Sequence, residues 1–139
     1  MVRLLAAAAI AVAAIIVAAL IERRRRHNAP TQPAWAVPAQ LDRTDFPHPA
    51  VPWLIAVFSS ATCTTCARVV EVAEAFAGDD VEVVDIEVGA SPSLHRRYRI
   101  DAVPITVVAD RAGVVRADFV GPVTGPELGA VIDRLRAEG

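Results

Sequence analysis

Lysine is absent from this sequence of 139 residues, and cysteine occurs only twice, at Cys63 and Cys66. Two cysteines are too few for a scaffold of several disulfide bonds or, within one chain, for a complete structural zinc site. All fourteen basic residues are arginines, and five of them flank an apolar leader, at positions 3 and 23–26. From residue 27 onward, nine arginines stand against fifteen acidic residues, a net charge of −6. Such an acidic domain argues against nucleic-acid binding through phosphate neutralisation.

Apolar residues are concentrated in an uninterrupted run of 18, Leu4–Ile21. As a helix this run would be about 27 Å long, close to the thickness of the hydrocarbon core of a bilayer. A buried core helix is a poor alternative, because no face of the run is polar. Glu22 and four arginines follow, where a cleaved signal peptide would need small residues. We therefore predict an uncleaved transmembrane anchor over residues 1–22, inserted through residues 4–21.

The charges beside the leader predict its orientation. Arg3 lies on the amino-terminal side, and four arginines at 23–26 lie on the carboxyl-terminal side. The positive-inside rule then favours a single-pass protein of the cell membrane whose carboxyl-terminal domain is cytoplasmic. An extracytoplasmic domain stays open as the alternative, since Glu22 offsets part of the charge. Residues 23–33 are predicted to be a basic, proline-rich linker and residues 34–139 one globular domain.

The globular part alternates strand-like and helix-like segments. Residues 53–58 (WLIAVF) form a continuous apolar run, which is typical of a strand buried on both faces. Residues 64–77 carry apolar residues at helical spacing, and Gly78 follows as a stop signal. Further strands are expected at 81–88, 104–109 and 114–120, further helices at 91–98 and 126–137, and a short first strand near 37–42. This order predicts an α/β fold with parallel pairing through crossovers and one antiparallel hairpin.

The two cysteines form a CxxC motif, with Thr64 and Thr65 between them, where the buried strand gives way to the helix. Cys63 would lie at the helix N-terminus, where unpaired N–H groups and the helix dipole stabilise a nucleophilic thiolate. Cys66, one turn further, would attack a mixed disulfide on Cys63 and release the substrate. Half of a zinc site and an inert disulfide have the same spacing. The strand before the motif, the helix after it and the lack of a second cysteine pair favour a redox motif.

In these features residues 37–139 resemble the thioredoxin family. The resemblance is carried by Phe58, the CxxC at 63–66, the Val-Asp-Ile run at 84–86, Tyr98-Arg99-Ile100, Val103-Pro104-Ile105-Thr106, Gly113, Val120-Gly121 and the final amphipathic helix. It implies a thioredoxin-like fold, a central mixed sheet of four to five strands flanked by helices, after the transmembrane helix. It also implies that Pro104 follows a cis peptide bond and lies against the CxxC, and that the Val103 backbone pairs with an extended substrate. Without the resemblance, Pro104 would be an ordinary strand-starting proline.

Next to the cysteines the sequence departs from the family's pattern. Thr62 stands where the family has a tryptophan, and Thr64 and Thr65 replace Gly-Pro. The hydroxyls of Thr64 and Thr65 either donate hydrogen bonds toward the Cys63 thiolate and modulate it, or belong to a plain first turn of the helix.

The buried aspartate that assists proton transfer in the family is replaced as well. Val57 occupies its position, six residues before Cys63, and the lysine that partners it aligns with Asp85. We expect either that the usual proton relay is absent or that Asp85 substitutes for it from the neighbouring strand.

Together these observations predict a membrane-tethered thiol–disulfide oxidoreductase with Cys63 as nucleophile and Cys66 as resolving thiol. Substrate contacts are expected at Val103, Pro104 and Thr62. The expected partners are protein disulfide or thiol substrates and an electron-donor protein, with no nucleic acid, no metal and no cofactor beyond the dithiol. Two alternatives stay open: a non-catalytic binding module with a thioredoxin fold, and a thiol-based carrier of metal or persulfide.

Two histidines are weaker candidates. His95 lies among arginines at 96, 97 and 99, and we expect it on a solvated basic face. His48, between two prolines, is expected in a loop.

Overall fold

A computed structural model describes residues 35–138 of the protein. The elements in this part are η1 (Arg43–Asp45), β1 (Trp53–Ser59), α2 (Thr64–Glu74), β2 (Val81–Glu87), α3 (Pro92–Arg97), β3 (Ile105–Ala109), β4 (Val115–Val120) and α4 (Gly125–Glu138). The predicted anchor (1–22) and linker (23–33) lie outside the described residues. No helix among residues 35–138 is long and apolar enough to cross a membrane.

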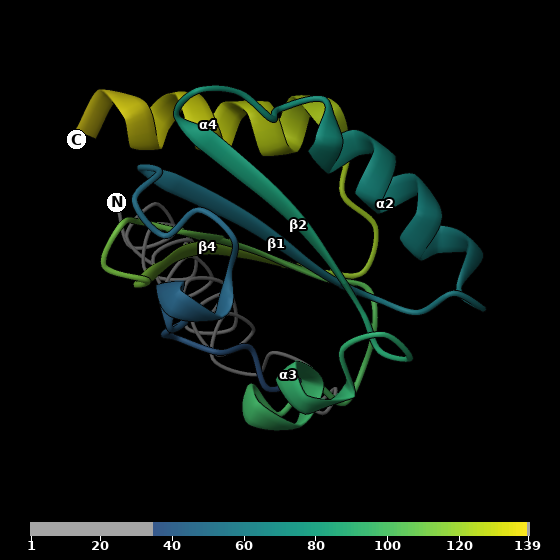
Figure 1. The fold of residues 1–139 in the computed structure, drawn as a ribbon. Coiled ribbons are helices and arrows are strands. Elements are labelled where there is room, and N and C mark those ends of the chain that lie inside the picture. Colours follow the sequence, from purple (N-terminus) through teal and green to yellow (C-terminus); the bar gives the residue numbers. More distant parts are fainter. Residues whose placement is uncertain (1–34, 139) are drawn as a thin grey trace, which may run out of the picture. The chain divides into compact units, whose positions relative to one another are not determined.

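The strands of the described part form a mixed four-stranded sheet in the order β2-β1-β3-β4 (Figure 1). β1 pairs in parallel with β2 and antiparallel with β3, so its residue Ala56 lies between Val84 and Val107. β3 and β4 form the antiparallel hairpin, with a register shift between Val108 and Ala109. The sheet with its flanking helices confirms the predicted α/β architecture, and the strands and helices expected from residue 53 onward are all present within a few residues.

One face of the sheet is covered by α2 and α4. Successive side chains of a strand point to opposite faces, and Ile55 and Val57 of β1 point to this side. They form one apolar cluster with Val69 of α2 and with Leu128 and Ile132 of α4. Each of these five side chains is at most 1% exposed. This packing fixes the direction of α2, and with it the place where α2 begins.

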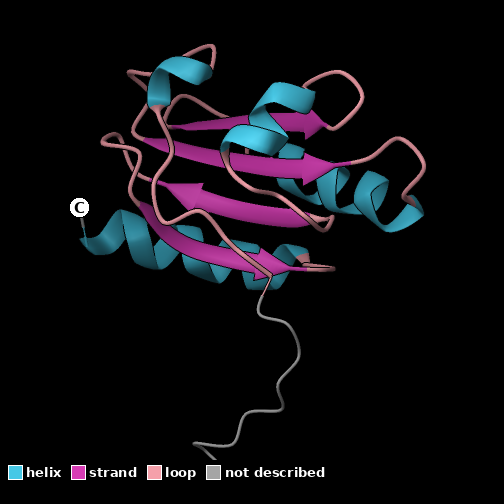
Figure 2. Cartoon of the chain, turned by 90° about the horizontal axis from the view of Figure 1, so that it is seen from below, coloured by secondary structure: helices cyan, strands magenta, loops and turns pink. Residues whose placement is uncertain are grey.

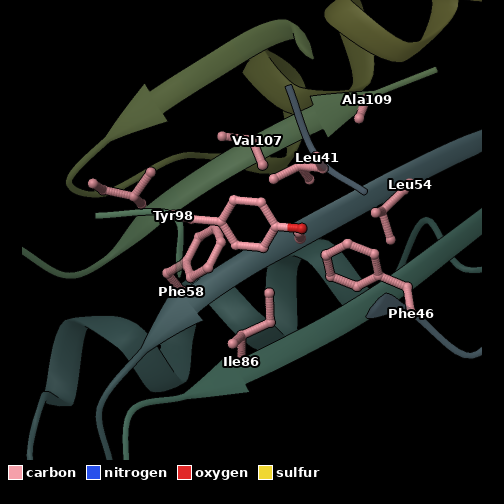
Figure 3. Close-up of a cluster of buried hydrophobic side chains, with 10 residues drawn as sticks. Leu41, Phe46, Leu54, Phe58, Ile86, Tyr98, Val107 and Ala109 are labelled. Carbon is pink, nitrogen blue, oxygen red and sulfur yellow. The ribbon is translucent and has the colours of Figure 1, made fainter. Parts of the chain in front are cut away.

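The other face of the sheet is covered by α3 and by the segment around η1, which lie in front of the strands in Figure 2. Leu54 and Phe58 of β1 point to this side. They are buried beneath Leu41, Phe46 and Tyr98 (Figure 3). The segment before β1 therefore belongs to the core of the domain.

The prediction of a first strand near residues 37–42 is wrong. The structure has one isolated bridge there, between Gln40 and Val114. Pro38 lacks a backbone donor, and the Asp42 side chain caps η1 by accepting the Thr44 N–H at 3.0 Å. These two residues limit the extended conformation to a single pairing.

The expectation for His95 is also wrong, because its side chain is buried, with 5% exposure. Its Nε2 lies 2.7 Å from the Ile86 carbonyl oxygen, and its ring meets Phe58 edge-on at 5.4 Å. The arginines around it follow the exposed side of α3. His95 thus connects α3 to β2. His48 lies in the loop between η1 and β1, as expected.

A buried ion pair and side-chain hydrogen bonds hold the segment around η1 in place. The side chains of Arg43 and Glu82 are each 6% exposed, and Arg43 Nη2 lies 3.8 Å from Glu82 Oε2. Tyr98 donates its hydroxyl to Asp45 Oδ2 at 2.5 Å and accepts the Asp42 N–H at 3.0 Å. Burial, followed by this bond to Asp45, raises the pKa of Tyr98 to about 12.

Candidate active site

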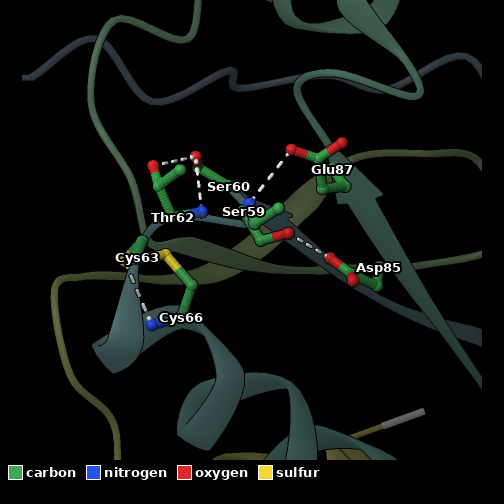
Figure 4. The surroundings of a disulfide bond; sticks show 8 residues. Ser59, Ser60, Thr62, Cys63, Cys66, Asp85 and Glu87 are labelled. Carbon is green, nitrogen blue, oxygen red and sulfur yellow. Dashed lines mark hydrogen bonds between the residues drawn. A yellow bond between two sulfur atoms is a disulfide. The ribbon is translucent and has the colours of Figure 1, made fainter.

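The two cysteines lie at the start of α2 and are joined by a disulfide bond (Figure 4). Cys63 is the N-cap of α2, and its Sγ accepts the Cys66 N–H at 3.1 Å. Their Cα atoms are 5.2 Å apart. Cys66 is 1% exposed, whereas Cys63 is only partly buried. One sulfur of the pair therefore faces outward at a helix N-terminus and the other faces the protein interior.

A short loop between β1 and α2 sets this geometry. β1 ends at Ser59, and the Cys63 N–H donates to the Ser60 carbonyl at 3.0 Å. The Ser60 hydroxyl lies 3.2 Å from Thr62 Oγ1 and accepts the Thr62 N–H at 3.4 Å. These turn contacts place Cys63 where α2 has free backbone donors.

The three threonines around the cysteines, Thr62, Thr64 and Thr65, are exposed. Among the described residues, neither Thr64 nor Thr65 makes a side-chain hydrogen bond to Cys63. Since the cysteines are joined in a disulfide here, the effect of these hydroxyls on a thiolate stays a prediction.

Pro104 is buried and follows a cis peptide bond, as the family resemblance implies, while Val103 is partly buried. Phe58 is opposite Ile105 in the β1–β3 register. Pro104 therefore lies at the end of the sheet where β1 leads into the CxxC loop. The Gly121 N–H donates to the Pro104 carbonyl at 2.9 Å and holds the end of β4 there as well.

A pocket of about 390 Å³ opens beside the disulfide. It is lined by Ser59, Ser60, Ala61, Cys63, Cys66, Ala67, Val70, Asp85 and Glu87. The structure thus brings Asp85, an expected site residue, to the same pocket as both cysteines. The Asp85 carboxylate accepts a hydrogen bond from the buried Ser59 hydroxyl (Figure 4).

The register of β1 and β2 explains why Asp85 reaches this pocket. Val57 and Asp85 are partners in the parallel pair, so their side chains lie on the same face of the sheet, under α2. Val57 is fully buried, but Asp85, on the neighbouring strand, is exposed.

The second carboxylate of the pocket, Glu87, supports the loops on either side. Its oxygens accept the N–H groups of Ala61 at 3.0 Å and Ala90 at 2.8 Å. Hydrogen bonds from Gly89, Ala61 and Ala90 hold the pKa of Glu87 below its usual range. Its hydrogen-bonding capacity is therefore committed to holding the CxxC loop and the loop that follows β2.

Sequence reasoning missed Ser59 and Glu87. The available signal was periodicity: Ser59 follows Val57 by two residues, so both side chains point to the side of α2. Nothing in either residue type alone distinguishes it from an ordinary polar residue at a strand end.

Among residues 35–138 no cluster of three or more histidine, cysteine or carboxylate side chains is placed to hold a metal ion. The site as described consists of a dithiol pair, a hydroxyl and two carboxylates. This set of groups can exchange electrons through the sulfurs and protons through the carboxylates.

No family model and no curated protein matches the sequence. Among solved structures, chloroplastic thioredoxin z is similar with a TM-score of 0.53 and 26% identity, over 62% of this chain and 80% of that one. A structure described only as that of a malarial protein is similar with a TM-score of 0.54 and 15% identity, over 60% and 96% of the two chains. The latter likeness shows the fold alone. The described domain has a thioredoxin-like fold, and its close cysteine pair indicates a redox-type function.

Proposed function

We propose that this protein is a membrane-tethered thiol–disulfide oxidoreductase that acts on partner proteins through Cys63 and Cys66. The observation that supports this most is the asymmetry of the pair. Cys63 is accessible and caps α2, where the helix terminus favours a thiolate, whereas Cys66 is 1% exposed and bonded to Cys63. A merely structural disulfide has no need of one accessible sulfur at a helix N-terminus.

In the proposed reaction, the reduced protein attacks a substrate disulfide with the Cys63 thiolate and forms a mixed disulfide. Cys66 then attacks Cys63 and releases the second substrate thiol. The substrate gains two electrons, and the protein is left with its own disulfide. The extended substrate would pair with the backbone at Val103, beside Pro104 and Thr62. An electron-donor protein would restore the dithiol, without a further cofactor.

The tether in this proposal is the apolar helix of residues 1–22, followed by the linker 23–33 and the domain 34–139. The arginines at 23–26 support a cytoplasmic domain, in which the protein would reduce a partner close to the membrane. An outward-facing domain would instead maintain thiols in an oxidising compartment.

The test is a redox titration of the full-length protein in detergent micelles, in glutathione buffers of graded ratio. Alkylation of free thiols would report the state of the cysteine pair. A reversible two-electron transition near the thioredoxin value of about −270 mV is expected for a reductase, and one near about −120 mV for an oxidant. A pair that never cycles would refute the proposal.

Trapping with single-cysteine variants separates the alternatives. Cys66→Ser is expected to accumulate a mixed disulfide with protein partners in membranes, and Cys63→Ser to accumulate none. Partner binding that persists unchanged in Cys63→Ser would instead favour a binding module. Sulfane sulfur or metal on the isolated protein would favour a carrier.

A further inference from the structure

The buried position of Cys66 raises the question of where its proton goes. An ordinary cysteine thiol has a pKa of about 8.5 and is mostly protonated at neutral pH, although only the thiolate attacks a disulfide. Cys66 is 1% exposed, so bulk water on the outside of the protein has little access to it. Cys66 is nevertheless one of the residues that line the pocket of about 390 Å³, which has room for water. A proton acceptor that serves Cys66 must therefore face this pocket.

Few ionisable groups face the pocket. Of the ionisable residues that line it, Asp85 and Glu87 come from β2, and the two cysteines come from the N-cap and first turn of α2. β1 and the loop after it contribute the neutral residues 59–61. The charged side chains of α2 at 68 and 71 line a separate groove beside the start of α4.

The histidine of α3 is also turned away from the pocket. His95 packs against Phe58, whose side chain points to the opposite face of the sheet, and its Nε2 is engaged by the Ile86 carbonyl. Only the two carboxylates of β2 remain as acceptors on the described residues around the pocket.

The two carboxylates differ in the hydrogen bonds that they already accept. Glu87 accepts backbone N–H groups from the loops on both sides. Asp85 has one hydrogen bond among the described residues, from the Ser59 hydroxyl. Ser59 is 3% exposed and is the last residue of β1, the strand that leads to Cys63. Because Ser59 also lines the pocket, its hydrogen bond holds the Asp85 carboxylate at the pocket. Asp85 is also exposed, which connects it to bulk solvent.

We propose that Asp85, positioned by Ser59, accepts the Cys66 proton across the pocket when the mixed disulfide on Cys63 is resolved. The inference rests on the proposed function. In this step the Cys66 sulfur forms a bond to the Cys63 sulfur, and the bond from Cys63 to the substrate sulfur breaks. The substrate leaves as a thiolate with the electron pair, and the Cys66 proton passes to Asp85 and from there to solvent. In the reverse reaction Asp85 returns a proton to Cys66.

A two-phase thiol-release assay tests this. The reduced full-length protein in micelles is mixed with the chromogenic aromatic disulfide 5,5′-dithiobis(2-nitrobenzoate). The first equivalent of released thiol reports attack by Cys63, and the second reports resolution by Cys66. Asp85→Asn is expected to slow the second phase about tenfold or more near neutral pH and to leave the first within about twofold. The slowing should shrink as pH rises, because the thiol then ionises without an internal acceptor.

Further variants separate this role from a structural one. Asp85→Glu should recover most of the second phase, and Ser59→Ala should slow it less than Asp85→Asn does. Asp118→Asn removes an exposed carboxylate on β4, away from the pocket, and should change neither phase. The pH dependence of the second phase is the decisive readout, since a general loss of structure would slow both phases at every pH.

Two results would overturn the inference, and they are distinguishable. A second phase in Asp85→Asn that matches the original protein across about pH 6 to 9 would remove Asp85 from the step and leave the proposed function intact. An original protein that releases a single equivalent would show that Cys66 does not resolve, and the proposed function would fail together with the inference.

Discussion

Replacing Gly113 by alanine is expected to detach the segment before β1 from the sheet. Gly113 is buried in the turn between β3 and β4, at φ +80°, where side chains are strained. A Cβ on this residue would overlap the carbonyl oxygen of Leu41 and lie 2.8 Å from the side-chain nitrogen of Gln40. Both of these neighbours belong to the segment that replaces the expected first strand.

The magnitude follows from what the overlap would break. The unfavourable φ costs about 1–2 kcal/mol for a residue with a Cβ. Moving the backbone apart also weakens three hydrogen bonds: Leu41 N to Gly113 O at 2.8 Å, Val115 N to Ala39 O at 3.0 Å and Gln40 Nε2 to Ala112 O at 2.7 Å. At about 1 kcal/mol for each hydrogen bond, added to the cost of the unfavourable φ, the total loss is about 4–5 kcal/mol. That is a large part of the stability of a typical domain, about 5–15 kcal/mol.

Gly121→Ala provides the matched control. Gly121 has a similar φ of +93°, but a Cβ there would meet nothing within 4 Å. The free energy of unfolding of this variant should therefore fall only by the cost of the unfavourable φ, about 1–2 kcal/mol. Urea unfolding of the full-length protein in micelles, followed by circular dichroism, gives both values, and amide exchange at Leu41 reports local detachment. Equal losses in the two variants, within about 0.5 kcal/mol, would refute the reasoning.

Three further predictions concern the polar groups that hold the domain together. Tyr98 is the single tyrosine; its pKa, raised from 10.0 to about 12, means that its contribution to stability is complete below about pH 10 and lost toward pH 12. An alkaline absorbance titration should therefore show ionisation near pH 12 when folded and near pH 10 in urea. His95→Ala should cost about 1–3 kcal/mol in urea unfolding, because it removes the buried hydrogen bond to the Ile86 carbonyl and the ring that packs against Phe58, whereas Arg96→Ala should stay within about 0.5 kcal/mol. Arg43→Met should lower the free energy of unfolding by about 3–5 kcal/mol, because it leaves the Glu82 carboxylate buried without its partner. Adding Glu82→Leu should restore at least about 1 kcal/mol in a double-mutant cycle, and no restoration would show that the buried pair is not coupled.

The parts of the fold that follow from local pattern were predictable. The run at 53–58 is apolar throughout because β1 lies between two strands and is packed on both faces. The helical spacing after the CxxC matches α2, although the helix ends at Glu74, earlier than the stop signal of Gly78. The place of the cysteines followed from the same junction of strand and helix. For these elements the sequence pattern and the tertiary environment agree.

The parts that failed depend on contacts between distant residues. Extended propensity near 37–42 does not reveal that Asp42 caps a turn and that Leu41 is drawn into the core. His95 has charged neighbours along the chain, but its ring is buried against Phe58, which is 37 positions earlier. In both cases the local composition favoured the predicted structure, but packing against distant residues determined the observed one.

The position of Asp85 on β2, rather than of a carboxylate at residue 57 on β1, has a physical consequence for the proposed chemistry. A charged residue at Val57 would lie on a central strand with 0% exposure, where desolvation is costly and where like charge at Asp85, its register partner, would be close. At Asp85 the same charge lies on β2, the outer strand of the described sheet, where it keeps contact with water. The Ser59 hydroxyl then provides the orientation that burial would otherwise provide. On the proposed route, a proton leaving Cys66 passes to a group that is already in contact with solvent, so substitutions at the other end of the sheet should leave resolution unchanged.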